Sequence, residues 1–129
     1  HFRAVLNELK KRQLPLGKQR KDEYVGYLQQ FVRKGVSREE QLLDKLLMAA
    51  LIEARSCERF RLLSENISDH SLRDFYYRLM VSEAAHYVLF IELARTYIDK
   101  DQVQQRWEEW LQYEKEIMHR LELRGDRIH

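Results

Sequence analysis

The spacing of apolar side chains predicts that the centre of the chain is a pair of amphipathic helices. Residues 42–63 and 72–97 each repeat apolar positions at steps of three and four, and such steps return to the same side of an α-helix. The polar stretch SENISDHS between them predicts a short turn. We therefore expect two long helices that pack side by side in opposite directions.

Weaker patterns on either side predict further helices. A short helix is expected from about Glu23 to Lys34, because Gly35 provides a typical helix end. A last helix is expected from about Gln102 to Leu123, followed by an irregular tail. The opening letters HFRAVLNEL have the apolar spacing of the end of another helix. We therefore expect that the chain begins inside a helix and is the C-terminal portion of a longer protein.

Residues at the expected helix starts support these boundaries. Ser37 and Glu40 form a capping-box pattern ahead of the first central helix. Asp69 or Ser71 can cap the second central helix. Side-chain oxygens at such positions accept hydrogen bonds from the unpaired backbone N–H groups of a first helical turn, so both helices have a defined start.

The composition is that of one mostly helical domain. Of the 129 residues, 44% are hydrophobic and 34% are charged, with only 4 Gly and 1 Pro. We expect residues 1–129 to form a single domain with a substantial core. No apolar run reaches membrane-spanning length and no signal-peptide pattern is present, so we expect a cytoplasmic protein without membrane contact. The single cysteine, Cys57, excludes an internal disulfide and is interpreted as a small core residue.

Three polar groups interrupt the apolar faces of the central helices. The first helix carries Glu53 at the centre of its face, and the second carries Glu83 and His86. The other positions on these faces are Leu46, Ala50, Cys57, Phe60, Leu72, Tyr76, Leu79, Phe90, Leu93 and Tyr97. Burying carboxylates costs several kcal/mol each unless something compensates their charge. Metal ions would compensate all of them together.

The spacing brings these polar groups to the same level of the expected hairpin. If the turn centres near Ser68, Glu53 lies 15 residues before it and Glu83 lies 15 residues after it. His86 follows Glu83 by one helical turn on the same face. A Glu together with Glu-x-x-His is half of the ligand set of a carboxylate-bridged di-iron or di-manganese site in a ferritin-like bundle. The alternative is a buried ion pair, or a core histidine satisfied by hydrogen bonds.

A second Glu-x-x-His pattern in the last helix is interpreted differently. Glu116 and His119 fall in line with Gln112 and Leu123. The apolar stripe of that helix runs instead through Val103, Trp107, Trp110, Ile117 and Leu121. We therefore expect the second pattern to lie on a solvated face, without a metal.

A basic segment precedes the short helix. Residues 10–21, KKRQLPLGKQRK, contain no acidic residue, and Pro15 and Gly17 break regular structure. The six cations are Lys10, Lys11, Arg12, Lys18, Arg20 and Lys21. The segment is either a solvated basic loop or a phosphate-binding patch for nucleic acid. The net charge of +2 does not decide between these readings.

Several stretches together carry a family resemblance. The sequence LIEARSCERF followed by SEAAHY resembles bacterial tRNA hydroxylases that act on the methylthio-isopentenyl-adenosine beside the anticodon, a ferritin-like non-haem di-iron family. The stretches KKRQLPLGK and RWEEWLQYE and the closing IH extend the resemblance along essentially the whole chain. It implies an all-α, ferritin-like four-helix bundle, with the N-terminal helix or helices missing from this chain. It also implies an O2-dependent monooxygenase with two non-haem iron ions.

The resemblance also implies roles for individual residues. Glu53, Glu83 and His86 would be metal ligands, and His1 resembles the end of the family's first Glu-x-x-His motif. Glu58 is the alternative to Glu53, because it also lies in the EARSCERF stretch. It sits about 140° further around the helix and is interpreted as the ion-pair partner of an arginine.

The implied partners are tRNA, dioxygen and an electron-donating reductase system, with the six cations of residues 10–21 binding tRNA. Two other functional classes stay open. One is a ferritin-like iron-binding or oxidase protein without a tRNA substrate. The other is a non-catalytic helical interaction module in which the Glu and His residues form hydrogen-bonded pairs. Iron content separates the last class from the others, and dependence on modified tRNA separates the first two.

Overall fold

The computed structural model describes the backbone of residues 18–128 and the side chains of residues 23–123. Four helices follow one another in this range: α2 (Lys18–Phe31), α3 (Arg38–Asn66), α4 (His70–Tyr97) and α5 (Lys100–Ile128). The described residues form no strand, so the all-α prediction is confirmed.

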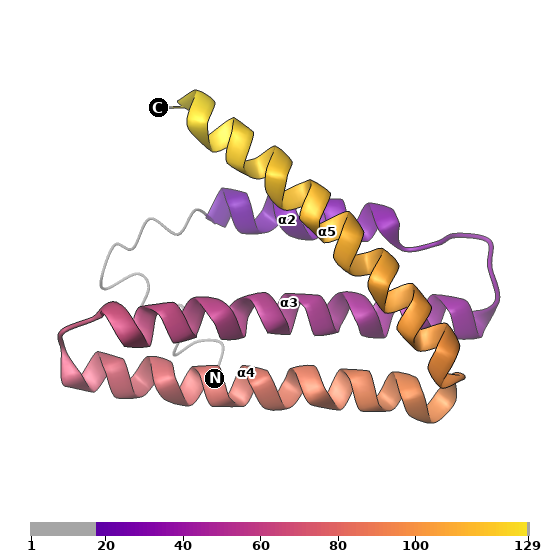
Figure 1. Ribbon diagram of the computed structural model, residues 1–129, viewed down its shortest axis with the longest axis horizontal. Coiled ribbons are helices and arrows are strands. Elements are labelled where there is room, and N and C mark those ends of the chain that lie inside the picture. Colours follow the sequence, from indigo (N-terminus) through magenta and orange to yellow (C-terminus); the bar gives the residue numbers. More distant parts are fainter. Residues whose placement is uncertain (1–17, 129) are drawn as a thin grey trace.

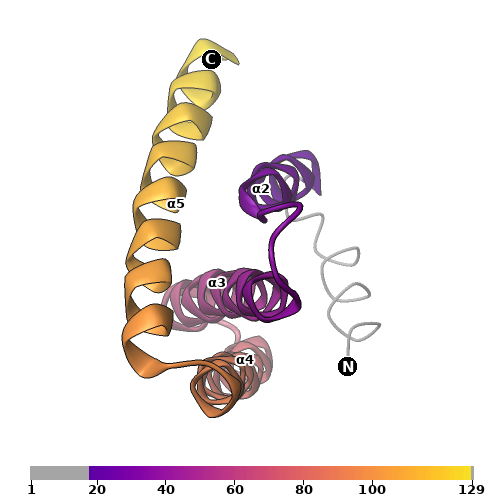
Figure 2. The ribbon, with the colours of Figure 1, turned by 90° about the vertical axis from the view of Figure 1, so that its right-hand side faces the viewer.

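The two central helices form the predicted antiparallel hairpin. Figure 1 shows α3 and α4 side by side along their whole lengths, joined by a short turn. In both views α3 lies between α2 and α4, and α5 runs obliquely across one side of the molecule (Figures 1 and 2). The hairpin is therefore covered on one side, and α2 and α5 pack on each other and on α3.

Several helix boundaries differ from the sequence prediction. Helix α2 ends at Phe31 rather than at Lys34, because the Arg33 backbone N–H donates to the Asp44 side chain instead of continuing the helix. Helix α2 begins at Lys18 rather than near Glu23, because lysine and arginine are good helix formers and the breakers Pro15 and Gly17 come earlier. Helix α5 continues to Ile128, so the prediction of an irregular tail is wrong for residues 124–128. A single glycine costs only about 1 kcal/mol in a helix, which is too little to end one by itself.

The predicted caps start both central helices. Ser37 Oγ accepts a hydrogen bond from the Glu40 backbone N–H at 3.2 Å and donates to Glu40 Oε1 at 3.0 Å. Asp69 Oδ1 accepts from the backbone N–H groups of Ser71 and Leu72. The sequence left Asp69 and Ser71 open as caps of α4, and the structure selects Asp69.

The apolar core has two parts. The larger one lies where α2, α3 and α5 meet and includes the fully buried Trp110, with Phe31 packed edge-on against its ring. The smaller one lies near the α3–α4 turn and contains Phe60, Leu72, Tyr76 and Leu79. Half of the apolar positions on the two predicted faces are buried and most of the others are half-buried, but Tyr97 at the end of α4 is 65% exposed.

A buried carboxylate that the sequence did not single out ties the larger core together. Asp44 on α3 is fully buried and accepts hydrogen bonds from Arg106 Nε at 2.7 Å, Trp110 Nε1 at 3.1 Å and the Arg33 backbone N–H at 2.8 Å. Burial alone would raise the pKa of Asp44, but the hydrogen bonds from Arg106, Arg33 and Trp110 hold the pKa below its ordinary value. Asp44 is therefore ionised and joins α3 to α5 and to the segment after α2.

None of the helices in the described range combines the length and the apolar character needed to cross a membrane.

Candidate metal centre

The hairpin brings Glu53, Glu83 and His86 together. Glu53 comes from α3, and Glu83 and His86 come from successive turns of α4. One ligand atom from each residue lies within 4.8 Å of the others. His86 Nδ1 is 3.7 Å from Glu53 Oε2 and 4.0 Å from Glu83 Oε2. The register expected from the sequence is therefore the register of the structure.

The carboxylates of this trio are more buried than its histidine. The side chains of Glu53 and Glu83 are 21% and 14% exposed, whereas that of His86 is 48% exposed. Glu53 Oε2 is itself buried and accepts no hydrogen bond from the described residues. At 3.7 Å, His86 Nδ1 is too far away to donate one. A buried oxygen left without a donor costs about 1–3 kcal/mol.

This arrangement fits a metal cation. Two carboxylates and an imidazole supply oxygen and nitrogen donors without a thiolate, which suits iron, manganese or zinc. A cation beside Glu53 Oε2 would satisfy the oxygen that the protein leaves without a donor. The partial exposure of His86 leaves one side of the trio accessible to solvent.

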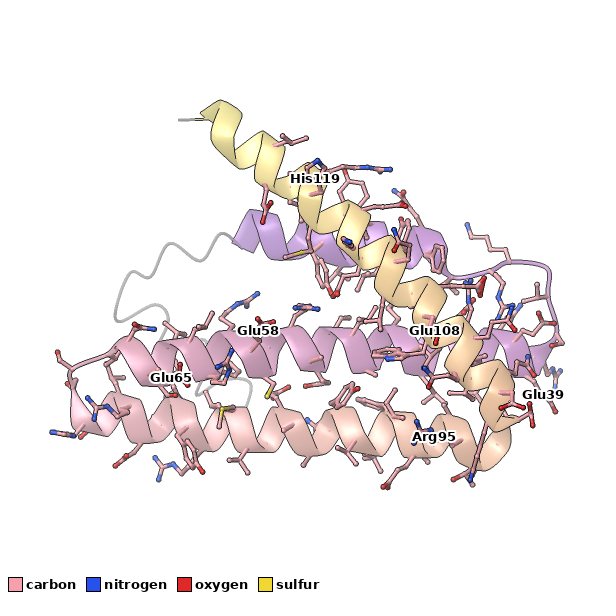
Figure 3. All side chains as sticks on the ribbon, viewed as in Figure 1. Glu39, Glu58, Glu65, Arg95, Glu108 and His119 are labelled. Atoms are coloured by element: carbon pink, nitrogen blue, oxygen red, sulfur yellow. The ribbon has the colours of Figure 1, made fainter. Side chains whose placement is uncertain are left out.

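Glu58, the alternative to Glu53, lies on a different face of α3. Its Oε2 accepts from Arg55 Nη1 at 2.6 Å, which agrees with its interpretation as the partner of an arginine. Glu58 also borders a cavity of about 350 Å³ together with Tyr24 of α2 and Met118 of α5. Figure 3 shows Glu58 on the side of α3 that faces away from α4. The structure therefore does not bring Glu58 to Glu83.

The second Glu-x-x-His pattern is solvent-exposed, as predicted. Glu116 and His119 are both exposed on α5, and His119 lies far along that helix from the hairpin (Figure 3).

Cys57 is partly buried, with its thiol 3.5 Å from the Met80 carbonyl oxygen, and burial raises the pKa of the thiol. A thiol in this environment is a poor nucleophile. The thiol is therefore not suited to nucleophilic chemistry, but Cys57 is only partly buried and lies beside the core rather than within it as predicted.

Seven predicted site residues lie where the structure describes no side chain. His1, Lys10, Lys11 and Arg12 lie outside the described residues. Lys18, Arg20 and Lys21 fall in the first turns of α2, where the structure describes the backbone only. Their backbone is helical, which corrects the expectation that the basic segment is a loop up to residue 21.

Sequence reasoning missed a second buried carboxylate. Glu114 on α5 is buried, accepts a hydrogen bond from the Tyr24 hydroxyl, and is bound by two Arg55 nitrogens at 2.8 and 2.7 Å. Burial, followed by the contact with Glu114, raises the pKa of Tyr24 above its ordinary value. The sequence did hold a signal, because Glu114 stands at helical spacing between the core residues Trp110 and Ile117. Its position, on the opposite side of α3 from Glu53, makes this a structural network rather than part of the trio.

Comparisons with known sequences agree with the resemblance carried by the motifs. The model of the family described as tRNA-(MS[2]IO[6]A)-hydroxylase (MiaE) matches residues 1–129. The chain is 39% identical over 100 residues to a tRNA 2-(methylsulfanyl)-N(6)-isopentenyladenosine(37) hydroxylase of Pseudomonas putida, covering 78% of this chain and 47% of that protein. It is 38% identical over 95 residues to the protein of the same name from Salmonella typhimurium, covering 74% of this chain and 34% of that protein. The matches thus span less than half the length of these relatives.

A solved structure supports the fold. The chain resembles a Synechococcus structure titled Protein 43 with aldehyde deformylating oxygenase activity, with a TM-score of 0.74 and 36% sequence identity. The likeness covers 88% of this chain and 56% of that one. The ferritin-like helical fold class expected from the sequence is thereby confirmed.

Proposed function

Because the chain belongs to the MiaE family of tRNA hydroxylases, we propose that it takes part in the reaction named for its relatives. That reaction is the O2-dependent hydroxylation of the isopentenyl group on a methylthio-adenosine beside the tRNA anticodon. The observation that carries the proposal is the meeting of Glu53, Glu83 and His86 around a buried oxygen that has no donor among the described residues. The proposed partners are tRNA, dioxygen and an electron-donating reductase system, and the proposed location is the cytoplasm.

In this proposal the trio holds iron. When bound, iron would supply the activation of dioxygen that oxidises a carbon–hydrogen bond. Glu53 and Glu83 would balance part of the charge of the cation, and His86 would offer a nitrogen donor. The paired helices keep the donors in register, so little has to move when the ion binds. His1, outside the described residues, is proposed as a further ligand of a complete site that holds two iron ions.

The basic segment is proposed to bind the tRNA backbone. Lys10, Lys11 and Arg12 lead into α2, whose first turns add Lys18, Arg20 and Lys21. Such cations bind phosphates without reading sequence, so they would position an anticodon loop whose modified base is already unpaired. Changing Lys10, Lys11 and Arg12 together to Ala is expected to weaken tRNA binding. The plot of log affinity against log salt concentration is expected to become less steep, with the magnitude of its negative slope smaller by roughly 2. A slope equal to that of the unchanged protein would argue against this role.

Iron content tests the proposed site. The chain is loaded anaerobically with ferrous iron, desalted and assayed for bound iron, beside Glu83→Ala and Glu53→Gln. Both changes are expected to lower bound iron, because each removes a charged donor of the trio. Glu58→Gln is the matched control, since Glu58 contacts Arg55 and not the trio. Iron content that is equal in all four proteins, or lost in all three variants alike, would contradict the assignment.

Activity on modified tRNA tests the substrate. Iron-loaded protein with a chemical reductant and dioxygen is expected to add one oxygen atom to tRNA that carries the methylthio-isopentenyl-adenosine, detected by mass spectrometry of its nucleosides. Transfer RNA without the modification serves as the control. Iron binding without this product would favour the next candidate.

An oxidase or oxygenase without a tRNA substrate is the second candidate function. It rests on the likeness to the Synechococcus protein, whose name includes an aldehyde deformylating oxygenase activity. The two candidates share the trio but differ in the basic segment, which an enzyme acting on a small uncharged substrate does not use. Oxygen consumption that does not depend on tRNA would favour this candidate.

A further inference from the structure

One side of α4 carries apolar residues that no described helix covers. Both ribbon views show α3 on one side of α4 and no helix on the opposite side (Figures 1 and 2). This opposite side, which we call the outer face of α4, presents Val81 and Val88, which are 50% and 48% exposed. Tyr77 is more exposed still and lies at the edge of this face, where it also borders a hollow between α3 and α4. These residues and the intervening Ala84 and Ala85 recur at steps of three and four positions, which places them on one stripe of the helix.

The outer face ends in two opposite charges. In the sequence of α4, Asp74 lies near its start. Arg95 lies near its end, toward α5 (Figure 3). Both side chains are exposed, and neither forms an ion pair with another described residue. Asp74 also borders the hollow between α3 and α4, near Arg61 and Arg73, but it forms no ion pair with either. The two residues therefore offer one negative and one positive group to a partner.

The charges and the apolar residues are arranged symmetrically. Val81 and Val88 are equally far from the midpoint between Ala84 and Ala85, and so are Asp74 and Arg95. A two-fold axis through that midpoint places each residue against its counterpart in a second, antiparallel helix. Val81 then meets Val88, and Asp74 meets Arg95, twice in the pair.

We propose that the outer face of α4 is a homodimer interface, in which α4 of one copy packs antiparallel on α4 of a second copy about this axis. The small side chains of Ala84 and Ala85 let the two helices approach closely at the crossing. Asp74 and Arg95 lie about 16 Å from the crossing, at 1.5 Å per residue. A shallow crossing angle, near the 20° of coiled-coil-like packing, keeps them within reach of each other.

Like charges argue against a parallel pair. In parallel register, Asp74 would face Asp74 and Arg95 would face Arg95, and each contact would be repulsive. Only the antiparallel arrangement pairs opposite charges at both ends and covers the valines in the middle.

The interface is independent of the proposed enzymatic function. Glu83 and His86 project from other sides of α4, and His86 stands about 150° around the helix from the centre of the outer face at 100° per residue. A dimer formed through the outer face therefore leaves the trio uncovered. Failure of tRNA hydroxylation would not affect this inference, and a monomeric protein would not affect the proposed site.

Sedimentation over a range of protein concentrations, with iron absent, tests the proposal. The chain is expected to reach twice its mass of 15.8 kDa. Asp74→Arg and Arg95→Asp alone are each expected to raise the dimer dissociation constant by about tenfold, because two ion pairs become repulsive contacts. The double variant, Asp74→Arg with Arg95→Asp, is expected to restore the original value, since the swapped charges attract again. Glu116→Arg on α5 changes the net charge as Asp74→Arg does and is the control for that variant.

Val81→Glu tests the apolar centre of the same interface. It is expected to give a monomer with unchanged helix content, measured by circular dichroism, because Val81 is not part of the core. A wild-type chain that stays monomeric at every concentration would overturn the proposal. So would a dimer whose dissociation constant is indifferent to Val81→Glu, or a double variant that dissociates as readily as either single one.

Discussion

Glu53 of α3 and His86 of α4 face each other across the hairpin with 3.7 Å between Oε2 and Nδ1. This separation is too long for a hydrogen bond but suits two side chains that are ligands of the same metal ion. Glu53 Oε2 is buried and no described residue donates to it. Glu53 Oε2 is therefore poorly satisfied unless a cation binds beside it, which is expected of a binding site rather than of a structural ion pair.

Glu53→Gln is expected to separate stability from metal binding. In metal-free protein the change removes a buried charge that lacks a donor, so the free energy of unfolding in urea is expected to rise by about 1 kcal/mol. Bound iron is expected to fall in the same variant, because an amide is a weaker ligand than a carboxylate. If metal-free Glu53→Gln proved markedly less stable than wild type, Glu53 would be a structural residue instead.

Asp44→Asn is expected to lower the free energy of unfolding strongly. Arg106 would stay buried beside a neutral side chain, and breaking a buried ion pair in this way typically costs about 3–5 kcal/mol. Urea unfolding at neutral pH measures the loss. Glu40→Gln removes the more exposed partner of Arg33 and is the matched control, with an expected cost below about 1 kcal/mol. Equal costs for the two variants would mean that the Asp44 network is not a main support of the fold.

Asp44 also predicts a pH dependence of stability. Its pKa in the folded protein lies below the ordinary value near 3.9 that it has in the unfolded chain. The stabilisation is therefore complete above the unfolded-state pKa and is lost as the pH falls through the folded-state pKa. The free energy of unfolding is expected to fall from about pH 5 downward, with a shallower fall in Asp44→Asn. Identical slopes in the two proteins would assign the acid sensitivity to other carboxylates.

The start of α4 offers a matched pair of variants. Asp69→Ala removes the side chain that accepts from the Ser71 and Leu72 N–H groups, and a lost N-cap costs about 1 kcal/mol. Ser71→Ala is expected to change the free energy of unfolding by only a few tenths of that, because Asp69 already caps the helix. Thermal or urea unfolding measures both. A larger effect for Ser71→Ala would show that the cap is assigned to the wrong residue.

The trio could be predicted from the sequence because its geometry is local and regular. Two antiparallel helices with one rise per residue bring residues equally distant from the turn to the same level, so Glu53 and Glu83 meet whatever the rest of the fold does. The same calculation places Glu58 on a different face of α3 from Glu53, and the contact of Glu58 with Arg55 agrees with that placement.

The buried networks could not be predicted in the same way. Asp44 and Glu114 both stand at helical spacing among core residues, but their partners come from distant parts of the chain. Arg106 lies 62 residues after Asp44, and Tyr24 lies 90 residues before Glu114. Nothing in local periodicity shows which distant cation or hydroxyl will reach a buried carboxylate. The early start of α2 and the late end of α5 were missed because helix ends depend on weak local preferences.

The position of Asp44 has a consequence for how the molecule opens. Asp44 holds the segment after α2 and the first half of α5 against α3, and Glu114 with Arg55 and Tyr24 forms a second buried connection among the same three helices. The chain thus divides into the α3–α4 pair, which is packed along its whole length and carries the trio, and the helices α2 and α5, which the larger core and these two networks attach to α3. Local detachment of α2 and α5 from α3 would expose the amides of α2 and α5 to hydrogen exchange, while those around Glu53 and Glu83 would remain protected. The trio would then stay assembled on α3 and α4 after α2 and α5, two of the four described helices, have detached.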